Sequence, residues 1–451
     1  MMLLFFLFIL FLFVYDTCQF SPDGRLYQNS VLIGTRLYVF GGYTGKLEYT
    51  NETIYLDLTK SFDTSRPLWI KDITGTAPIN AEFGTACLSP IDNSTVYLIG
   101  GVAFNETSLQ YFKPPLIYAF NSVESKWTIL NASGFASFDS NTTNIYNDMQ
   151  AVMRHSLIYL FSGTNTLKPS ESNLSTVSTL VTTLNIYNTK TMTWLFFNFS
   201  NTPTPREGYT ANLLKNGHIV YIGGTETPNG ASRETNVNMN NIPVFDTDDL
   251  IWILMTTSGD PVASRNSHSA VLTEDGKIII FGGESGYGFV KVSPDLAILD
   301  TNSNPYEWSI PNIPPENKPP ALAGHSSTLY NNNYMLIIFG RRTSNQPVTS
   351  TEVPLINDII YVFDINNLVW TSTFSSTPAS GQCTTHCVIG LVTAIISLLI
   401  ISSIGIGCYY YKVKSINIFS FLCICRNKKP FSFLCICRNK KPFVNSNDPL
   451  R

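Results

Sequence analysis

The sequence predicts an all-β fold, a six-bladed β-propeller, followed by one C-terminal transmembrane α-helix. The first observation is a set of six tryptophans spaced 56 to 67 residues apart. The second is an apolar run that ends in glycine 25 to 31 residues before each tryptophan. The third is another apolar run between these two, ending in Asp or Asn. A period of this length with constant internal landmarks indicates repeated units of one architecture.

Each landmark occurs once in every repeat. The tryptophans, expected to be structural, are Trp69, Trp127, Trp194, Trp252, Trp308 and Trp370. The glycine-terminated runs close at Gly42, Gly101, Gly163, Gly224, Gly283 and Gly340. The second runs end at Asp57, Asn121, Asn188, Asp246, Asp300 and Asp364, and four of these residues precede their tryptophan by six positions.

One repeat reads as four short strands in order. The first is an apolar run such as 269–272, which a tight turn at 274–277 joins to the second strand. The second strand is apolar on both sides, as expected for a strand buried on two faces, and its glycines permit positive φ as the chain leaves the sheet. The third carries the Asp or Asn, whose side chain can bond the backbone of the following turn. The fourth contains the tryptophan, a large anchor expected to pack between neighbouring sheets.

A single four-stranded sheet cannot bury both of its faces, whereas six sheets stacked around an axis can. The six repeats run from a first strand near 28–33 to a fourth strand at 370–374, so ring closure does not require a strand borrowed from the other terminus. Some exchange of strands at the seam stays open. The alternative is a β-sandwich in which the periodicity is accidental.

The repeat resembles the kelch repeat, which has a strand, Gly-Gly, a strand with an aromatic residue and Asp, and then Trp. The resemblance covers about residues 25–375 and includes an Arg-x-x-His segment at Arg265–His268. Two repeats depart from it, with Ser162-Gly163 in the third and Gly340-Arg341 in the sixth. The resemblance implies the galactose oxidase-like central propeller superfamily and, with the chain ends described next, the single-pass kelch proteins found in filamentous fungi.

The N-terminus resembles a secretory signal peptide. Residues 1–14 are almost wholly apolar, a core too short to span a bilayer comfortably. We expect a signal peptide at 1–18 and the propeller at 19–375. An uncleaved anchor is the alternative.

The C-terminal region predicts a membrane span. Residues 388–411 are 24 uncharged residues, long enough to cross a bilayer as a helix. A stalk at 376–387 precedes the span, and the tail 412–451 carries nine Lys or Arg and one Asp. Positive charge beside the span predicts a cytoplasmic tail and a propeller outside the cell or in the lumen. The expected location is the plasma membrane or another secretory-pathway membrane, with type I topology.

Glycosylation signals agree with export, because every one lies before the predicted span. The candidate acceptors are Asn51, Asn93, Asn105, Asn131, Asn141, Asn173 and Asn198. The mature ectodomain has three cysteines. Cys87 lies in an apolar first strand and is expected to be a buried thiol, while Cys383 and Cys387 could pair with each other, pair between chains or, as a minor reading, bind metal with His386.

The tail contains a tandem duplication, with SFLCICRNKKPF at both 420–431 and 432–443. Each copy combines apolar residues, two cysteines and a basic segment, a combination that suits an anionic lipid surface. A solvated tail is the alternative. The cysteines are candidates for acylation, together with one at the end of the span: Cys408, Cys423, Cys425, Cys435 and Cys437.

The sequence does not favour an enzyme. A copper oxidase of the galactose-oxidase type would need two His, tyrosine ligands and a cysteine that modifies one tyrosine. His268 and His325 occupy the same position in two repeats, which favours a structural role, and Cys87 lies in a different repeat from either. No catalytic residue, cofactor, metal or nucleic-acid partner is predicted.

A binding function is favoured instead, because loops on a rigid scaffold commonly carry recognition. The loops between the second and third strands are long, and they should share one face with the connections between blades. We expect an extracellular protein or glycan to dock there over repeats 4–6, where no glycosylation signal occurs. The candidate contacts are Arg233, Glu284, Arg341 and Arg342. A structural role in adhesion or cell-wall contact is the alternative, and the sequence does not identify the ligand.

Overall fold

The computed structural model describes residues 20–376, with gaps at 47, 78–80, 83, 106–109, 112–116, 134–143, 168–176, 181–182, 198, 200, 228–234, 287–288 and 348–354. The chain divides into two units, Met1–Pro378 and Ala379–Arg451, and every described residue belongs to the first. The predicted signal peptide, membrane span and cytoplasmic tail lie outside the described residues. Within the described residues, no helix has the length and apolarity needed to cross a membrane.

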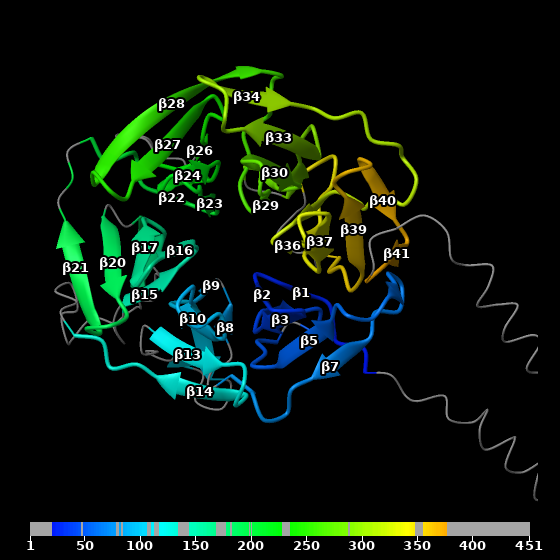
Figure 1. Cartoon of the computed structure of the whole chain (residues 1–451), viewed down its shortest axis with the longest axis horizontal. Coiled ribbons are helices and arrows are strands. Elements are labelled where there is room, and N and C mark those ends of the chain that lie inside the picture. The colour runs from blue at the N-terminus through cyan, green and yellow to red at the C-terminus, as the bar shows by residue number, and fades with distance from the viewer. Residues whose placement is uncertain are drawn as a thin grey trace, which may run out of the picture. The chain divides into compact units, whose positions relative to one another are not determined.

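The predicted all-β propeller is confirmed: antiparallel sheets surround a common axis (Figure 1). The described strands form six four-stranded units, called blades 1–6 below, each ordered from the axis outward. Blade 1 is β2 (Asn29–Ile33), β3 (Arg36–Phe40), β5 (Thr53–Asp57) and β7 (Trp69–Lys71); blade 2 is β9 (Thr85–Leu88), β10 (Thr95–Ile99), β13 (Ile117–Asn121) and β14 (Lys126–Ile129); blade 3 is β16 (Ala151–Arg154), β17 (Leu157–Phe161), β20 (Leu184–Asn188) and β21 (Thr193–Phe197). Blade 4 is β23 (Thr210–Leu213), β24 (His218–Ile222), β27 (Asn241–Asp246) and β28 (Ile251–Gly259); blade 5 is β29 (Ser269–Leu272), β30 (Lys277–Phe281), β33 (Leu296–Asp300) and β34 (Tyr306–Ser309); blade 6 is β36 (Ser326–Tyr330), β37 (Tyr334–Ile338), β39 (Ile360–Asp364) and β40 (Val369–Thr371).

Blades 4 and 5 are joined into one eight-stranded sheet. β28 is nine residues long, and its last three residues pair in parallel with β34, placing Gly259 opposite Trp308. The other four blades are separate sheets. The outer edge of this half of the ring is therefore tied by backbone hydrogen bonds as well as by side-chain packing.

The six tryptophans occupy equivalent places, as predicted. Each one pairs across the sheet with the residue that precedes the Asp or Asn at the end of the third strand. The pairs are Leu56–Trp69, Phe120–Trp127, Tyr187–Trp194, Phe245–Trp252, Leu299–Trp308 and Phe363–Trp370. In all six blades the Asp or Asn oxygen accepts a hydrogen bond from a backbone N–H two residues further on, which confirms the predicted turn.

The core consists of six apolar clusters among the described residues, each filled by two neighbouring blades. β3 shows how one strand serves two clusters. Leu37 and Val39 pack toward blade 6, while Tyr38 and Phe40 pack toward blade 2. The second strands are thus buried on both faces, as their composition predicted. Trp127 departs from the pattern, because it is half-buried and the other five tryptophans are buried.

The glycine turn of the sixth repeat differs from the prediction. In four blades two glycines with positive φ follow the second strand, as at Gly223 and Gly224. In blade 6, β37 ends at Ile338, and the two residues with positive φ are Phe339 (φ 59°) and Gly340 (φ 85°). The repeat pattern predicted Gly340-Arg341 at this turn instead. Phe339 tolerates this position because its ring is fully buried and stacks on Trp69 of blade 1, with ring centroids 5.5 Å apart.

The ring closes between blades 6 and 1 without a borrowed strand among the described residues. The first strands β2 and β36 contact each other. Gln28 Nε2 donates to Ser326 Oγ at 3.1 Å and to the Ile338 carbonyl at 2.9 Å. At the outer edge, β41 (Thr373–Phe374) pairs with β6 (Phe62–Asp63), which lies in the chain between β5 and β7 of blade 1. Side-chain bonds near the axis and a short ribbon outside therefore hold the seam.

Candidate functional site

One face of the ring carries a second set of short pairings. The segment that leads into each blade pairs with the loop between that blade's second and third strands. The ribbons are β1 (Arg25–Leu26) with β4 (Tyr43–Thr44), β8 (Ala81–Glu82) with β11 (Val102–Asn105), β15 (Asn144–Asn147) with β18 (Thr164–Leu167), β22 (Arg206–Glu207) with β25 (Thr225–Glu226), and β35 (Leu322–Ala323) with β38 (Arg341–Arg342). In blade 5 a single bridge joins Asn266 to Glu284. The predicted sharing of one face by these loops and connections is confirmed, and we call it the long-loop face.

The chain approaches the axis just before each first strand. Tyr27, Gly208, Ser267 and Gly324 occupy the same place in four blades, and all have φ between 53° and 63°. Their backbones are linked in sequence around the axis, since Tyr27 N donates to Gly324 O, Gly324 N to Ser267 O, and Ser267 N to Gly208 O, each at 2.9 Å. Asp148 of blade 3 also has positive φ, at 53°. A rigid backbone collar therefore surrounds this end of the axis.

The next residue in each of these segments bonds to the preceding blade. His268 Nε2 lies 3.1 Å from Thr210 Oγ1, and His325 Nε2 lies 2.8 Å from Ser269 Oγ. Burial lowers the pKa of His325 to about 3 and also lowers the pKa of His268 well below its ordinary value. Both rings are therefore neutral at physiological pH and serve as links between blades, the structural role that their repeated position indicated.

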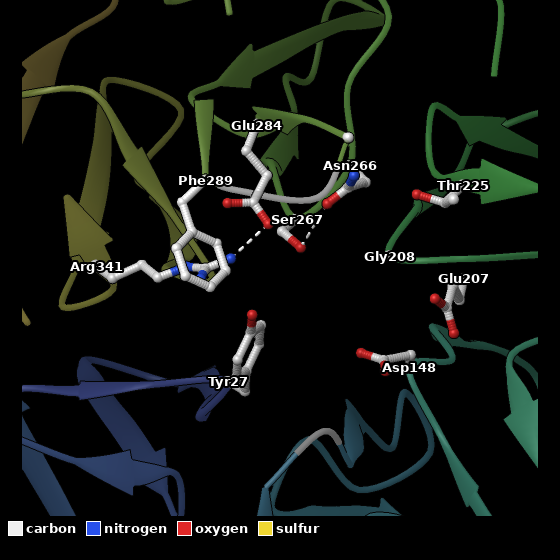
Figure 2. Close-up of a pocket in the computed structure, with 11 residues that line it drawn as sticks. Tyr27, Asp148, Glu207, Gly208, Thr225, Asn266, Ser267, Glu284, Phe289 and Arg341 are labelled. Atoms are coloured by element: carbon white, nitrogen blue, oxygen red, sulfur yellow. Dashed lines mark hydrogen bonds and ion pairs between the residues drawn. The ribbon is translucent and has the colours of Figure 1, made fainter. Parts of the chain in front are cut away.

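A cavity of about 200 Å³ lies at the axis on the long-loop face (Figure 2). It is lined by residues from blades 1, 3, 4, 5 and 6: Tyr27, Asp148, Glu207, Gly208, Thr225, Asn266, Ser267, Glu284, Gly286, Phe289 and Arg341. A smaller hollow of about 100 Å³ shares part of this lining, including Tyr27 and Ser267, and reaches His268 and His325. We call the larger one the axial cavity.

A buried ion pair forms one wall of the axial cavity. Arg341 Nη2 donates to Glu284 Oε1 across the boundary between blades 6 and 5. The two residues are 3% and 5% exposed. The ring of Phe289 covers the guanidinium, with its centroid 3.4 Å from Arg341 Cζ, and the centroid of the Tyr27 ring lies 6.0 Å from the same atom (Figure 2). Two aromatic rings therefore shield the guanidinium from water.

The backbone fixes this wall. Ser344 N donates to Phe289 O and Lys291 N donates to Ser344 O, both at 2.9 Å, so the loops of blades 5 and 6 are joined beside the ion pair. Arg341 itself lies in β38 and also bridges to Ile356. Because both partners sit on paired backbone, their geometry is set before any ligand arrives.

The cavity has an excess of negative charge. Its lining holds three carboxylates, at Asp148, Glu207 and Glu284, and one guanidinium, at Arg341. Asp148 and Glu207 are half-buried and lie across the cavity from Arg341 (Figure 2). Burial raises the pKa of Glu284 to about 7, although the ion pair with Arg341 opposes the rise. Glu284 Oε2 is buried and has no hydrogen-bond partner among the described residues.

The candidate contacts predicted from the sequence are placed very differently from one another. Arg342 is exposed on the long-loop face, as expected. Glu284 and Arg341 were expected to be open loop charges, but the structure places them together in the buried pair, because the two loops fold against each other. Arg233 lies outside the described residues. Contact of these residues with a partner stays a prediction.

Of the predicted glycosylation sites and cysteines, some are described by the structure and others lie outside the described residues. Asn93 and Asn131 are exposed, Asn51 is half-buried, and Asn105 lies in β11. Asn141, Asn173 and Asn198 lie outside the described residues, as do Cys383, Cys387 and the candidate acylation sites. Cys87 is a buried free cysteine, as predicted, and burial raises the pKa of its thiol to about 12. His218 begins β24, and its Nε2 is 3.2 Å from Asp246 Oδ2.

Sequence reasoning missed Tyr27, Asp148 and Ser267 as cavity residues. The position before the repeated His, as in Arg265–His268, could have indicated Ser267, but Tyr27 and Asp148 precede Gln28 and Met149 and carry no such signal. A larger hollow of about 760 Å³ lies on the opposite face over blades 5 and 6. Its lining includes the charged residues Asp275, Lys277, Asp300 and Glu307, of which Asp275 and Lys277 pair with each other at 2.9 Å. The axial cavity is the stronger candidate because it opens on the long-loop face.

Comparison with known proteins agrees with this fold. The family model of the Attractin/LZTR1 beta-propeller matches residues 14–287, and that of the KLHDC2/KLHL20/DRC7 Kelch-repeats domain matches residues 217–398. Kelch domain-containing protein 3 of Rattus norvegicus is 26% identical over 57% of this chain and 64% of its own length. Kelch domain-containing protein 10 of Xenopus tropicalis is 24% identical over 66% of this chain and 67% of its own length. The match thus spans less than two thirds of the first relative.

A solved structure titled "Structure of YjhT" superposes with a TM-score of 0.52 at 14% identity, covering 78% of this chain and 98% of that one. At this identity the similarity concerns the fold alone. Proteins with kelch domains are generally protein-interaction modules.

Proposed function

The chain belongs to the Attractin/LZTR1 beta-propeller family, and on that premise we propose that it is a membrane-anchored interaction protein whose propeller binds a protein partner on the long-loop face. The observation that carries the proposal is the axial cavity. It opens on the face that bears the long loops, and its wall contains a buried carboxylate oxygen, Glu284 Oε2, with no partner among the described residues. A buried acceptor left unpaired costs free energy, which a ligand that donates a hydrogen bond would recover.

Blades 4–6 supply most of the cavity lining, including Glu207, Asn266, Glu284 and Arg341. This agrees with the docking area expected from the absence of glycosylation signals in the same repeats. A rigid backbone collar beneath the cavity lowers the entropy lost on binding, because few groups must be ordered. The partner therefore meets a preformed surface.

The anchoring half of the proposal rests on the sequence. The apolar segments at 1–14 and 388–411 and the basic tail support a single-pass type I protein with its propeller outside the cell or in the lumen. The seven glycosylation signals before residue 388 support the same orientation. The tail would then contact anionic lipid of the inner leaflet.

Photo-cross-linking from two matched positions tests the docking face and does not require the partner to be identified first. A benzophenone amino acid replaces Arg342, exposed on the long-loop face, or Lys190, exposed in a turn between third and fourth strands on the other face. We expect protein adducts from position 342 and none from position 190 after irradiation of cells that carry the full chain. Adducts from position 190 alone, or from neither position, would contradict the proposal.

A further inference from the structure

We infer that the axial cavity binds a basic side chain, lysine or arginine, that the protein partner inserts along the propeller axis. This inference rests on the proposed function and names the chemistry that the partner must present. The geometry points to a cation because three carboxylates line the cavity and its single guanidinium is already engaged.

Arg341 is not available to bind an anion. Its Nη2 donates to Glu284, and the Phe289 ring covers its planar face at 3.4 Å. Its Nε has no hydrogen-bond partner among the described residues, but that atom is buried. An acidic ligand would therefore have to displace Glu284 from a buried pair, which would leave a buried charge uncompensated. The cavity thus excludes the ligand class that a free arginine would attract.

The oxygen acceptors line a shared space. Glu284 Oε2 is buried and unpaired among the described residues. Asp148 and Glu207 lie half-buried on the opposite wall, where Glu207 Oε2 accepts a hydrogen bond from Thr164 Oγ1 (Figure 2). Tyr27, Thr225 and Ser267 add hydroxyl oxygens to the lining. An ammonium group has three donors and no acceptor, and a guanidinium has five, so either could donate to several of these oxygens at once. A cavity of about 200 Å³ also has the size of one long side chain rather than of a folded element.

Burial of Glu284 sets a condition on this binding. Its raised pKa means that a substantial fraction of the carboxyl is protonated near neutral pH, and a bound cation would favour the ionised form. The charged groups around it are Arg341, Asp148 and Glu207, of which only Arg341 favours ionisation. Affinity for a basic side chain should therefore increase from pH 6 to pH 8.

Labelled peptides provide the test. The purified full chain is titrated with fluorescent Gly-Ser-Gly-X-Gly-Ser-Gly, acetylated and amidated at its ends, in which X is Lys, Arg, norleucine or Glu, and anisotropy is measured. We expect saturable binding when X is Lys or Arg, and at least about tenfold weaker binding when X is norleucine or Glu. Norleucine keeps the length and apolar stem of lysine but lacks the ammonium group, so it isolates the charge.

Three variants each remove one lining charge with little change of shape: Asp148→Asn, Glu207→Gln and Glu284→Gln. Each should weaken lysine-peptide binding by about tenfold, whereas Glu274→Gln, at an exposed turn on the opposite face, should change it by less than about twofold. Glu207→Gln and Asp148→Asn keep the test valid should Glu284→Gln fail to fold.

Two results would overturn the inference: equal binding of the lysine and norleucine peptides, or lysine binding unaffected by all three cavity variants. The absence of saturable binding up to about 5 mM peptide would do the same. The two proposals can fail separately. If a partner is cross-linked from position 342 but the lysine peptide does not bind, the proposed docking face stands and only the inference of a basic side chain is refuted.

Discussion

Glu284 and Arg341 form the residue-scale centre of the site. They are 57 residues apart in the chain and come from neighbouring blades, yet each is nearly inaccessible to water. Two opposing effects act on Glu284, namely burial, which raises its pKa, and the guanidinium, which lowers it. Burial wins, and the pKa of about 7 exceeds the ordinary value of 4.5. The carboxyl therefore takes up a proton on folding between these two pH values.

This proton uptake predicts a pH dependence of stability. A carboxyl with a raised pKa contributes stability that is fully present below its unfolded pKa and is lost as pH rises through the folded pKa. Glu284→Gln removes this contribution, so the loss of unfolding free energy caused by the substitution should be larger at pH 5 than at pH 8, by about 2–3 kcal/mol. Urea denaturation of both proteins at the two pH values measures it, with Glu274→Gln as the exposed control. Parallel pH profiles would show that Glu284 is not titrating as described.

At Phe339, backbone strain and side-chain packing have opposite effects on stability. Its φ of 59° places it in a backbone region that costs a non-glycine residue roughly 1–2 kcal/mol. Its ring is fully buried against Trp69, and truncating a buried phenylalanine costs about 3–5 kcal/mol. Packing should outweigh strain, so Phe339→Gly is expected to lower the free energy of unfolding by about 2–3 kcal/mol in urea titration. A variant as stable as the native protein would show that strain relief compensates fully.

At the scale of elements, neighbouring blades share every apolar cluster that the described residues form. Within the described residues, no blade forms an apolar core by itself. Each blade is therefore stabilised by packing against its neighbours in the ring. The fourth strand contributes its tryptophan to this packing. Trp308 is 1% exposed, and its indole N–H donates to the Met239 carbonyl at 3.1 Å. Trp127 also makes such a bond, to Gly75 at 2.8 Å, but its side chain is half-buried.

Equivalent tryptophans should therefore differ in their contribution to stability. Trp308→Ala and Trp252→Ala should each lower the free energy of unfolding by about 3–5 kcal/mol. Trp127→Ala should lower it by only about 1–3 kcal/mol, because folding removes less of the Trp127 side chain from water. Guanidinium titration monitored by circular dichroism gives the three values. A cost for Trp127→Ala that matches or exceeds that of Trp308→Ala would refute the packing argument.

The repeat landmarks were sufficient to predict the strands, because each landmark performs a local task. Asp246 bonds its own turn, Gly224 adopts positive φ, and Trp252 pairs with a residue fixed by the strand register. The turn of blade 6 could not be predicted in this way. Phe339 takes the place of a glycine only because Trp69, from the far end of the propeller sequence, provides a surface for its ring.

The site was less predictable than the strands for the same reason. Loop length and the distribution of glycosylation signals indicated the face on which the axial cavity opens, but the pairing of Glu284 with Arg341 depends on how two loops meet around the ring. Asp148 and Tyr27 reach the cavity through backbone with positive φ, in segments whose sequences differ from blade to blade. No local sequence pattern predicts that these segments reach the cavity.

At the scale of the whole molecule, we propose that a recognition face is joined to a membrane anchor. The tail prediction concerns the anchor. We expect thioester-linked acylation at one or more of Cys408, Cys423, Cys425, Cys435 and Cys437, because these cysteines stand beside apolar and basic residues at a predicted lipid surface. Acyl-exchange labelling should give a signal that requires hydroxylamine and disappears when all five are changed to serine. A signal that persists in that variant, or the absence of a signal in the native chain, would contradict acylation at these cysteines and favour the alternative of a solvated tail.

The central claim is that a partner binds at the axis on the long-loop face, and hydrogen–deuterium exchange of the full chain with and without its cross-linked partner protein tests it most directly. We predict slower exchange in β22, β25, β31 (Glu284–Ser285) and β38 on binding, with no change in the turns at 188–192 and 273–276. Protection confined to those turns, with unchanged exchange around Glu207, Glu284 and Arg341, would contradict it.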